Sequence, residues 1–222
     1  AANWNVPQTV TITAIDDAID EPSPEAELVT HSIATAAVEY VAAPFTGGGG
    51  ASSNEVSIVI ADNDVAGVVI SKAATGVDET GPTSDSYTVV LTSEPTADVT
   101  INLGYANGTD GANDVTFSAG SLTFTAANWN VPQTVTITAI DDAIDEPSPE
   151  AELVTHSIST AAAEYVAAPF TGGGGANANE VSISILDNDV AGVVISKAAT
   201  GVDETGPTSD SYTVVLTSEP TA

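Results

Sequence analysis

Several residue types are missing from this sequence, and each absence narrows the class of protein to which it belongs. Its 222 residues include no cysteine, no methionine and no arginine, and the only lysines are Lys72 and Lys197. Without cysteine, neither disulfide bonds nor thiolate metal sites hold the fold. With 31 acidic residues and a net charge of −29, the chain repels nucleic acid and anionic membranes, which both bind clustered Lys and Arg. We expect neither partner.

Long apolar runs and aromatic residues are also scarce. No stretch approaches the ~20 consecutive apolar residues of a membrane span, and only 5% of the residues are aromatic. The absence of methionine removes a common oxidation target. Together with the absence of cysteine, it is typical of an exposed, bacterial-type surface protein. We therefore expect an extracellular location.

The hydrophobic content argues for a folded chain despite the high charge. Hydrophobic residues make up 42% of the sequence, and many of them alternate with polar residues as in strands. The carboxylates therefore lie on a folded scaffold, where their repulsion costs stability unless cations neutralise it. A surface adapted to salt, or simple solubility, would also account for the charge.

An internal repeat organises the whole sequence. Residues 1–97 return as residues 126–222, a shift of 125 positions. Only six of the 97 aligned pairs differ: Ala34/Ser159, Val38/Ala163, Ser52/Asn177, Ser53/Ala178, Val59/Ser184 and Ala61/Leu186. Near-identical copies favour a spacer or fibre over an enzyme. We expect one complete repeat at 65–189, the later part of a preceding repeat at 1–64, and the first part of a following repeat at 190–222.

The complete repeat reads as a series of short strands separated by turn signals, which is typical of a β-sandwich or barrel. Alternating apolar residues place one face of each strand in a core. No segment has a convincing helical period, and Ala161–Ala163 allows at most one helical turn. The predicted strands are Val68–Ser71, Ser86–Thr92, Asp98–Tyr105, Val115–Phe117, Ser121–Thr125, Gln133–Ile140, Glu152–Thr160 and Glu180–Leu186.

The differences between the repeats test one of these strands. Val181, Ile183 and Ile185 are predicted to point inward. The exchanges Val59/Ser184 and Ala61/Leu186 fall on the opposite phase, where substitution is tolerated. The predicted facing of this strand is therefore consistent with the repeat.

Acidic residues of the complete repeat cluster beside strand ends. The clusters are Asp78-Glu79, Asp110 with Asp114, Asp141 to Glu150, and Asp187-Asn188-Asp189. Because loops gather at the two ends of a sandwich, clusters that are distant in sequence can converge. Converging carboxylates raise one another's pKa or bind a cation. Ca²⁺ accepts six to eight oxygen ligands in irregular loops, whereas zinc and copper favour thiolate or clustered histidine.

These clusters, with the segments around them, resemble a Calx-beta domain. The resemblance covers the whole repeat and rests on five motifs in order. They are Val77-Asp78-Glu79-Thr80-Gly81, Tyr105 to Asp114, Leu122-Thr123-Phe124, Ile140 to Glu146, and Ile185 to Asp189. The resemblance implies a seven-stranded, immunoglobulin-like β-sandwich that is repeated in tandem. It also implies calcium binding and a place in large repetitive surface proteins.

The resemblance also implies which residues bind calcium. In the complete repeat these are Glu79, Asp114, Asp141, Asp142, Glu146, Asp187, Asn188 and Asp189. In the incomplete repeats the corresponding residues are Asp16, Asp17, Glu21, Asp62, Asp64 and Glu204. Asn188 stands where the family has a third acid, and Pro147 and Pro149 replace further acids, so we expect fewer or weaker calcium ions than in a sensor domain.

Other residues have simpler interpretations. His31 and His156 have no nucleophile motif near them and are expected to be structural. Trp4 and Trp129 are expected to anchor a core or an interface, with sugar stacking as the alternative. The runs Gly47–Gly50 and Gly172–Gly175 are expected to be loops without a phosphate-binding role. Asn107-Gly108-Thr109 is a glycosylation sequon.

Function follows as a set of competing hypotheses. The leading one is a non-catalytic structural repeat of an extracellular fibre, sheath or adhesin stalk, which calcium stiffens. Its partners are copies of itself, because neither incomplete repeat closes a core alone; the copies are neighbouring chains of a fibre or the continuing polypeptide. The alternative is a glycan- or ice-binding adhesion module. A hydrolase that uses Asp141 and Glu146 needs a cleft with aromatic platforms, which the composition does not favour.

Overall fold

The computed structural model describes residues 3–106, 114–206 and 208–221. Within these ranges every regular element is a β-strand, apart from one 3₁₀ turn at Ala163–Tyr165. The chain divides into two compact units, Ala1–Val65 and Ala66–Ala222. The predicted loop at 107–113 and its glycosylation sequon lie outside the described residues.

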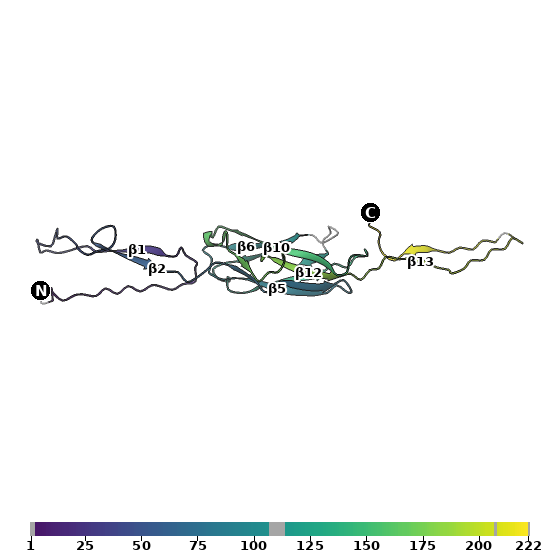
Figure 1. Ribbon diagram of the computed structural model, residues 1–222, viewed down its shortest axis with the longest axis horizontal. Coiled ribbons are helices and arrows are strands. Elements are labelled where there is room, and N and C mark those ends of the chain that lie inside the picture. The colour runs from purple at the N-terminus through teal and green to yellow at the C-terminus, as the bar shows by residue number, and fades with distance from the viewer. Residues whose placement is uncertain (1–2, 107–113, 207, 222) are drawn as a thin grey trace. The chain divides into compact units, whose positions relative to one another are not determined.

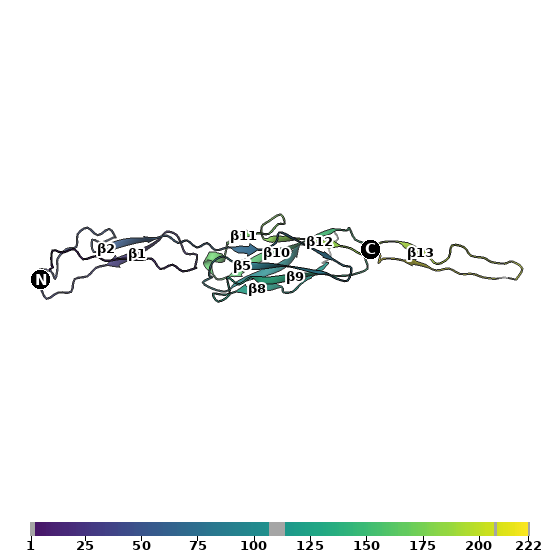
Figure 2. The same cartoon turned by 90° about the horizontal axis from the view of Figure 1, so that it is seen from below.

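Two five-stranded sheets build the complete repeat, and both are visible in Figures 1 and 2. The first sheet has the order β4-β12-β10-β6-β8, and the second has the order β11-β3-β5-β9-β7. All neighbours pair antiparallel except two parallel pairs, β4 with β12 and β3 with β11. The strands are β3 (Val68–Ile70), β4 (Ala74–Asp78), β5 (Ser84–Leu91), β6 (Val99–Ala106), β7 (Val115–Phe117), β8 (Ser121–Phe124), β9 (Gln133–Ala139), β10 (Glu150–Thr160), β11 (Phe170–Thr171) and β12 (Glu180–Leu186).

The two sheets face each other across one hydrophobic core. Alternate residues of the long strands point into it, as the period of two requires. Tyr87, Val89 and Leu91 of β5 are buried, as are Val135 and Ile137 of β9. From the opposite sheet come Val99, Ile101, Phe124, Val154, Val181, Ile183 and Ile185. The repeat is therefore all-β and β-sandwich-like.

The strands predicted from alternation are confirmed, with shifts of one or two residues at their ends. The predicted facing of β12 is also confirmed, because Ser184 and Leu186 are exposed while Ile183 and Ile185 are buried. Two strands were not predicted. β4 has the sequence Ala-Thr-Gly-Val-Asp and β11 has only two residues. Both form by parallel pairing with strands far along the chain, and the local sequence carries no trace of such pairing.

The N-terminal segment, residues 3–65, keeps part of the repeat's pairing. Its strands β1 (Glu25–Thr30) and β2 (Glu55–Ile60) pair antiparallel, with Glu25 opposite Ile60. The corresponding pair in the complete repeat is Glu150 opposite Ile185. The β1–β2 pair therefore has the same register as the β10–β12 pair of the complete repeat.

The C-terminal segment, residues 190–221, contains the strands β13 (Val193–Ile195) and β14 (Val214–Leu216). Val193 lies opposite Leu216, as Val68 lies opposite Leu91 in the complete repeat. None of the described helical residues forms a helix long and apolar enough to cross a membrane.

Candidate metal centre

Strand pairing brings the acidic loops of the complete repeat together at one end. The Glu79 amide donates a hydrogen bond to the Leu186 carbonyl (3.0 Å), which continues the β4–β12 pairing beyond its last strand residues. Glu79 is thereby held next to the Asp187–Asp189 loop. In the same way, the Ile140 amide donates to the Asp114 carbonyl (2.7 Å), which continues the β7–β9 pairing. This second contact holds Asp114 next to the loop after β9.

Six of the predicted ligands form two carboxylate trios. The first trio contains Glu79, Asp141 and Asp189, and the second contains Asp114, Asp142 and Glu146. Within each trio, one oxygen from every residue lies within 4.8 Å of the others. Asp141 and Asp142 are consecutive but belong to different trios, as expected of neighbouring side chains that point to opposite sides of an extended segment.

Glu79 is the most buried member of the first trio. Its side chain is 1% exposed, and its Oε2 atom has no hydrogen-bond partner among the described residues. Burial, followed by the nearby charges of Asp187, Asp142 and Asp114, raises the pKa of Glu79 from 4.5 to about 7. A buried carboxylate oxygen without a donor is costly, and a bound cation removes that cost.

The other predicted ligands orient the trios. Asp187 accepts hydrogen bonds from the amides of Glu146 (3.1 Å) and Asp189 (3.0 Å). The Asn188 side-chain amide donates to Asp141 Oδ1 (2.8 Å). All eight predicted ligands of the complete repeat therefore lie in or against one cluster, although Asp187 and Asn188 belong to neither trio.

Both lysines lie among the described residues, and neither forms an ion pair with this cluster. Lys72 binds Asp85 of β5 (2.7 Å), and Lys197 binds Asp210 in the C-terminal segment. The sequence has no arginine. Neither lysine therefore compensates the negative charge of this cluster.

The donor set fits a hard divalent cation. Both trios offer only carboxylate oxygens from loops, and the first includes the buried Glu79. Ca²⁺ prefers oxygen ligands and tolerates irregular loop geometry. The set contains neither thiolate nor imidazole, the ligands on which zinc and copper sites depend.

Two buried acids of β10 were not predicted as ligands, although Glu150 was assigned to an acidic cluster at a strand end. Glu150 and Glu152 are 2% and 1% exposed on β10, and the Asp114 amide donates to Glu152 Oε1 (3.3 Å). Both belong to the same alternating phase as the buried Val154 and His156. The sequence does contain a signal for their burial: the alternation that buries Val154 also places Glu152 and Glu150, two and four residues earlier, on the inward face.

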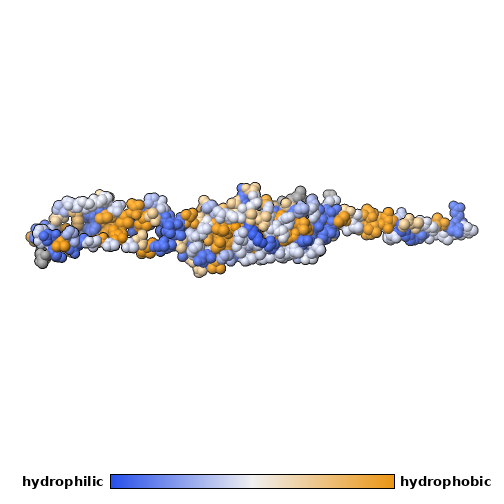
Figure 3. Space-filling model, turned by 60° about the horizontal axis from the view of Figure 1, so that its bottom comes forward, coloured by the Kyte–Doolittle hydropathy of each residue, from blue (hydrophilic) through white to orange (hydrophobic). Residues whose placement is uncertain are grey.

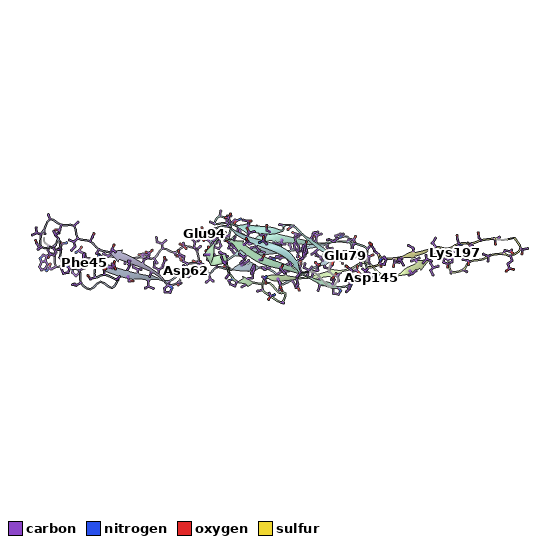
Figure 4. All side chains as sticks on the ribbon, turned by 90° about the horizontal axis from the view of Figure 1, so that it is seen from above. Phe45, Asp62, Glu79, Glu94, Asp145 and Lys197 are labelled. Atoms are coloured by element: carbon purple, nitrogen blue, oxygen red, sulfur yellow. The ribbon has the colours of Figure 1, made fainter. Side chains whose placement is uncertain are left out.

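The loop that carries Asp141 and Asp142 also contacts the following repeat. Asp145 accepts a hydrogen bond from the Ala191 amide (2.9 Å), and the Glu219 amide donates to the Ala143 carbonyl (2.6 Å). Figure 4 shows Glu79 and Asp145 at the same end of the complete repeat, with Glu94 at the other end. The acidic cluster therefore lies next to the start of the next repeat.

The N-terminal segment reproduces part of this arrangement. The Glu21 amide donates to Asp62 Oδ2 (3.0 Å), as Glu146 does to Asp187. Partial desolvation by neighbouring atoms, followed by the charges of Asp17, Glu25 and Asp62, raises the pKa of Glu21. Burial, with the charges of Asp62, Asp16 and Asp17, raises the pKa of Asp64.

The predicted acids of the N-terminal segment therefore lie near one another; they are Asp16, Asp17, Glu21, Asp62 and Asp64. Among the described residues, they form no trio with oxygens as close as those of the complete repeat. Glu21 is exposed where Glu146 is buried. Glu204, predicted from its equivalence to Glu79, lies exposed in the C-terminal segment and joins neither trio.

The remaining predicted residues have structural surroundings. His156 is buried, and its ring contacts Tyr87 Oη through Nε2 (2.8 Å) and the Asn179 carbonyl through Nδ1 (2.8 Å). Because a carbonyl only accepts, Nδ1 carries the proton and Nε2 accepts from Tyr87. Trp129 packs against the hydrophobic core, whereas the equivalent Trp4 is exposed.

Comparison of the sequence with protein-family models and with curated proteins found no match.

Proposed function

We propose that this chain is a non-catalytic structural segment of an extracellular fibre, sheath or adhesin stalk. Its repeats bind Ca²⁺ at the acidic end of the sandwich, and the bound ions stiffen the connection to the next repeat. The proposal is supported most by one observation, the convergence of six carboxylates from four loops into two trios, one of which contains the buried Glu79. The contacts of Asp145 and Ala143 with the following repeat supply the link to stiffness.

The proposal includes a finer description of the fold, a seven-stranded immunoglobulin-like sandwich of the Calx-beta kind. On this description β3 and β4 are two halves of the first strand, one in each sheet. β7 and β8 are likewise parts of one strand that moves between the sheets, because β7 pairs with β9 and β8 pairs with β6. The strands β5, β6, β9, β10 and β12 complete the seven, and the two-residue β11 is an addition.

Calcium binding is tested by thermal unfolding and calorimetry. The chain is stripped with EGTA, and its unfolding is followed in EGTA, in CaCl₂ and in MgCl₂ at equal ionic strength. We expect Ca²⁺ to raise the melting temperature and Mg²⁺ to raise it less, because Mg²⁺ demands near-octahedral geometry and gives up its water reluctantly. Identical melting in all three buffers would remove calcium from the proposal.

Stiffening is tested separately from binding. Spin labels on either side of the repeat boundary, at Ser148→Cys and Thr213→Cys in this cysteine-free chain, report the spread of distances between the two repeats. We expect a narrower distribution in CaCl₂ than in EGTA. Calcium binding without narrowing would retain the metal site and refute its mechanical role.

One observation favours a second candidate function, an adhesion surface for glycans or ice. The pairing of β5 with β9 sets Ser84 opposite Thr138, Ser86 opposite Thr136 and Thr88 opposite Thr134. These six hydroxyl residues share the face of the sheet opposite Tyr87 and Val135, which point into the core. A flat array of hydroxyls is a surface on which a polyhydroxylated ligand can form repeated hydrogen bonds.

This second function is tested by a glycan array and an ice-shaping assay with the wild-type chain and Thr136→Val. The substitution removes one hydroxyl from the middle of the face and keeps the β-branched shape. Binding or ice shaping that Thr136→Val weakens would support the adhesion function, and a negative result in both assays would reject it.

A further inference from the structure

The outer face of the first sheet of the complete repeat is polar but carries no charge. Three strands of this sheet lie side by side in the order β10-β6-β8, and the structure describes all of their residues. Their two acidic residues, Glu150 and Glu152, are buried on the core side. Every residue that alternates outward along the three strands is therefore uncharged, in a chain whose net charge is −29.

Six polar side chains form two rows across this face. β6 pairs with β10 on one side and with β8 on the other, and residues that lie directly opposite share one face of the sheet. The first row is Ser157, Asn102 and Ser121, and the second row is Ser159, Thr100 and Thr123. Neighbouring strands are about 4.8 Å apart and alternate residues of one strand about 6.7 Å apart. We call this flat array the polar grid.

The side chains of the polar grid are available to a ligand. None of the six forms a hydrogen bond with another described residue, and only Thr100 is half-buried, while the other five are exposed. The hydroxyls of the opposite sheet are used within the fold. There, Ser84 Oγ contacts Thr138 Oγ1 (2.8 Å), and Ser118 Oγ accepts from the Thr136 amide (2.9 Å).

Strand propensity does not account for the composition of the polar grid. Threonine is favoured in strands, but asparagine is depleted there, and Asn102 lies on the middle strand between Ser157 and Ser121. A hydroxyl both donates and accepts a hydrogen bond, and the asparagine amide supplies two donors and an acceptor. The rows therefore present donors and acceptors side by side across three strands.

We propose that the polar grid binds a neutral, polyhydroxylated polymer, that is, an uncharged polysaccharide. A neutral polymer meets no repulsion from this strongly acidic chain, whereas an anionic polysaccharide or a second copy of the chain does. The proposal goes beyond the structural function of the repeat. It depends on no bound cation, and it uses the sheet opposite to the β5–β9 face.

One repeat binds such a polymer weakly. The polar grid has no aromatic ring on which a sugar can stack, and each hydrogen bond to the polymer replaces one to water. Tandem repeats compensate, because each further contact with the same polymer is intramolecular and raises the overall affinity. Figure 3 shows broad pale areas on the complete repeat, the colour of weakly polar residues such as serine and threonine.

Affinity electrophoresis measures this weak binding directly. The 222-residue chain migrates in native gels that contain EGTA and dextran, xyloglucan or laminarin, which are neutral polymers with different backbones. Because these polymers carry no charge, they retard the protein only when they bind it. We expect at least one of them to retard the wild type, and alginate, which is anionic, to have no effect. A wild type that no neutral polymer retards, or that alginate retards, would overturn the proposal.

Two triple variants locate the binding face. Ser157→Ala/Asn102→Ala/Ser121→Ala removes the first row of the polar grid, and Ser84→Ala/Ser86→Ala/Thr136→Val makes a comparable change on the opposite sheet. Neither alters the charge, so both should migrate like the wild type in plain gels. The first should bind at least about tenfold more weakly, and the second should bind like the wild type. Equal losses, or a loss confined to the second variant, would contradict binding at the polar grid.

Two further measurements keep this test decisive. Thermal unfolding in the same buffer shows whether each variant is folded. Should the first triple variant fail to fold, Ser159→Ala takes its place, since the repeat already carries alanine at the equivalent residue, Ala34; its binding should fall about threefold. In plain gels, mobility should not depend on protein concentration. A slower species that grows with concentration and disappears in the grid variant would identify a second copy as the occupant and refute the polysaccharide. Because EGTA is present throughout, failure here leaves the calcium proposal untouched.

Discussion

Replacement of Glu79 by glutamine is expected to have opposite effects on stability with and without calcium. The change keeps the shape of the side chain and removes its charge. In the cation-free protein the ionised Glu79 is buried beside other carboxylates, so its pKa is raised from 4.5 to about 7. Glutamine removes this unfavourable charge, and it also removes a ligand. The variant should therefore be more stable than the wild type in EGTA and should gain less from calcium.

The magnitude follows from the pKa. A shift from 4.5 to about 7 corresponds to about 3 kcal/mol of lost stability at pH 8. Solvent at the exposed Asp141 and Asp142 screens part of this, so we expect Glu79→Gln to stabilise the EGTA-treated protein by about 1 to 3 kcal/mol. At about 10 mM Ca²⁺ and a dissociation constant of about 0.1 to 1 mM, the wild type gains roughly 1.4 to 2.7 kcal/mol per ion.

The raised pKa also fixes the direction of the pH dependence. The folded state holds the Glu79 proton more tightly than the unfolded state, so the favourable contribution is complete below pH 4.5 and is lost as pH rises through about 7. In EGTA, the wild type should therefore lose stability relative to Glu79→Gln as pH rises from 4.5 to 8. Calcium reverses this trend because it binds the ionised form.

The assay is thermal and urea unfolding followed by Trp129 fluorescence in a Trp4→Phe background, so that only the complete repeat reports. Glu204→Gln is the matched control, since it makes the same change at the equivalent residue of the C-terminal segment. It should leave the Trp129 transition unchanged. A Glu79→Gln variant that is destabilised in EGTA and retains the full gain from calcium would refute the reasoning.

Three further predictions concern the same transition. Tyr87→Phe leaves the buried Nε2 of His156 without its donor and should cost about 1 to 3 kcal/mol. Burial also lowers the pKa of His156, so the stability that depends on the neutral ring should be lost as pH falls below 6.5. A His156→Gln variant that loses as much stability as the wild type between pH 6.5 and 5 would contradict this. Ile183→Ala should cost about 2 to 5 kcal/mol and Leu186→Ser less than about 1 kcal/mol, because only the first side chain lies in the core; equal losses in urea unfolding would contradict the facing of β12. Asn188→Asp replaces the hydrogen-bond donor to Asp141 by a negative charge. It should lower the melting temperature in EGTA and increase the rise in melting temperature that calcium causes. A variant that is less stable than the wild type in both buffers would show that Asn188 only supports the loop.

Local sequence patterns were sufficient for most of the strands. Alternation in β5, β9 and β12 reflects the period of two in an extended chain, and it identifies the buried residues without any knowledge of their partners. The two exchanges at Ser184 and Leu186 indicated the same facing independently. β4 and β11 were missed because parallel pairing with β12 and β3 stabilises them, and that pairing joins residues about 100 positions apart.

The sequence by itself determined the repeat, the strand faces and the accumulation of acids at strand ends. Only the tertiary structure decided how those acids combine. It separated Asp141 from Asp142 into different trios, buried Glu79 completely, and brought Glu152 against Asp114. The physical reason is that local periodicity depends on the chain's own geometry, whereas burial and mutual distance depend on which strands pair across the sheet. The repeat shows this directly, because identical sequences are buried in the complete repeat and exposed in the terminal segments.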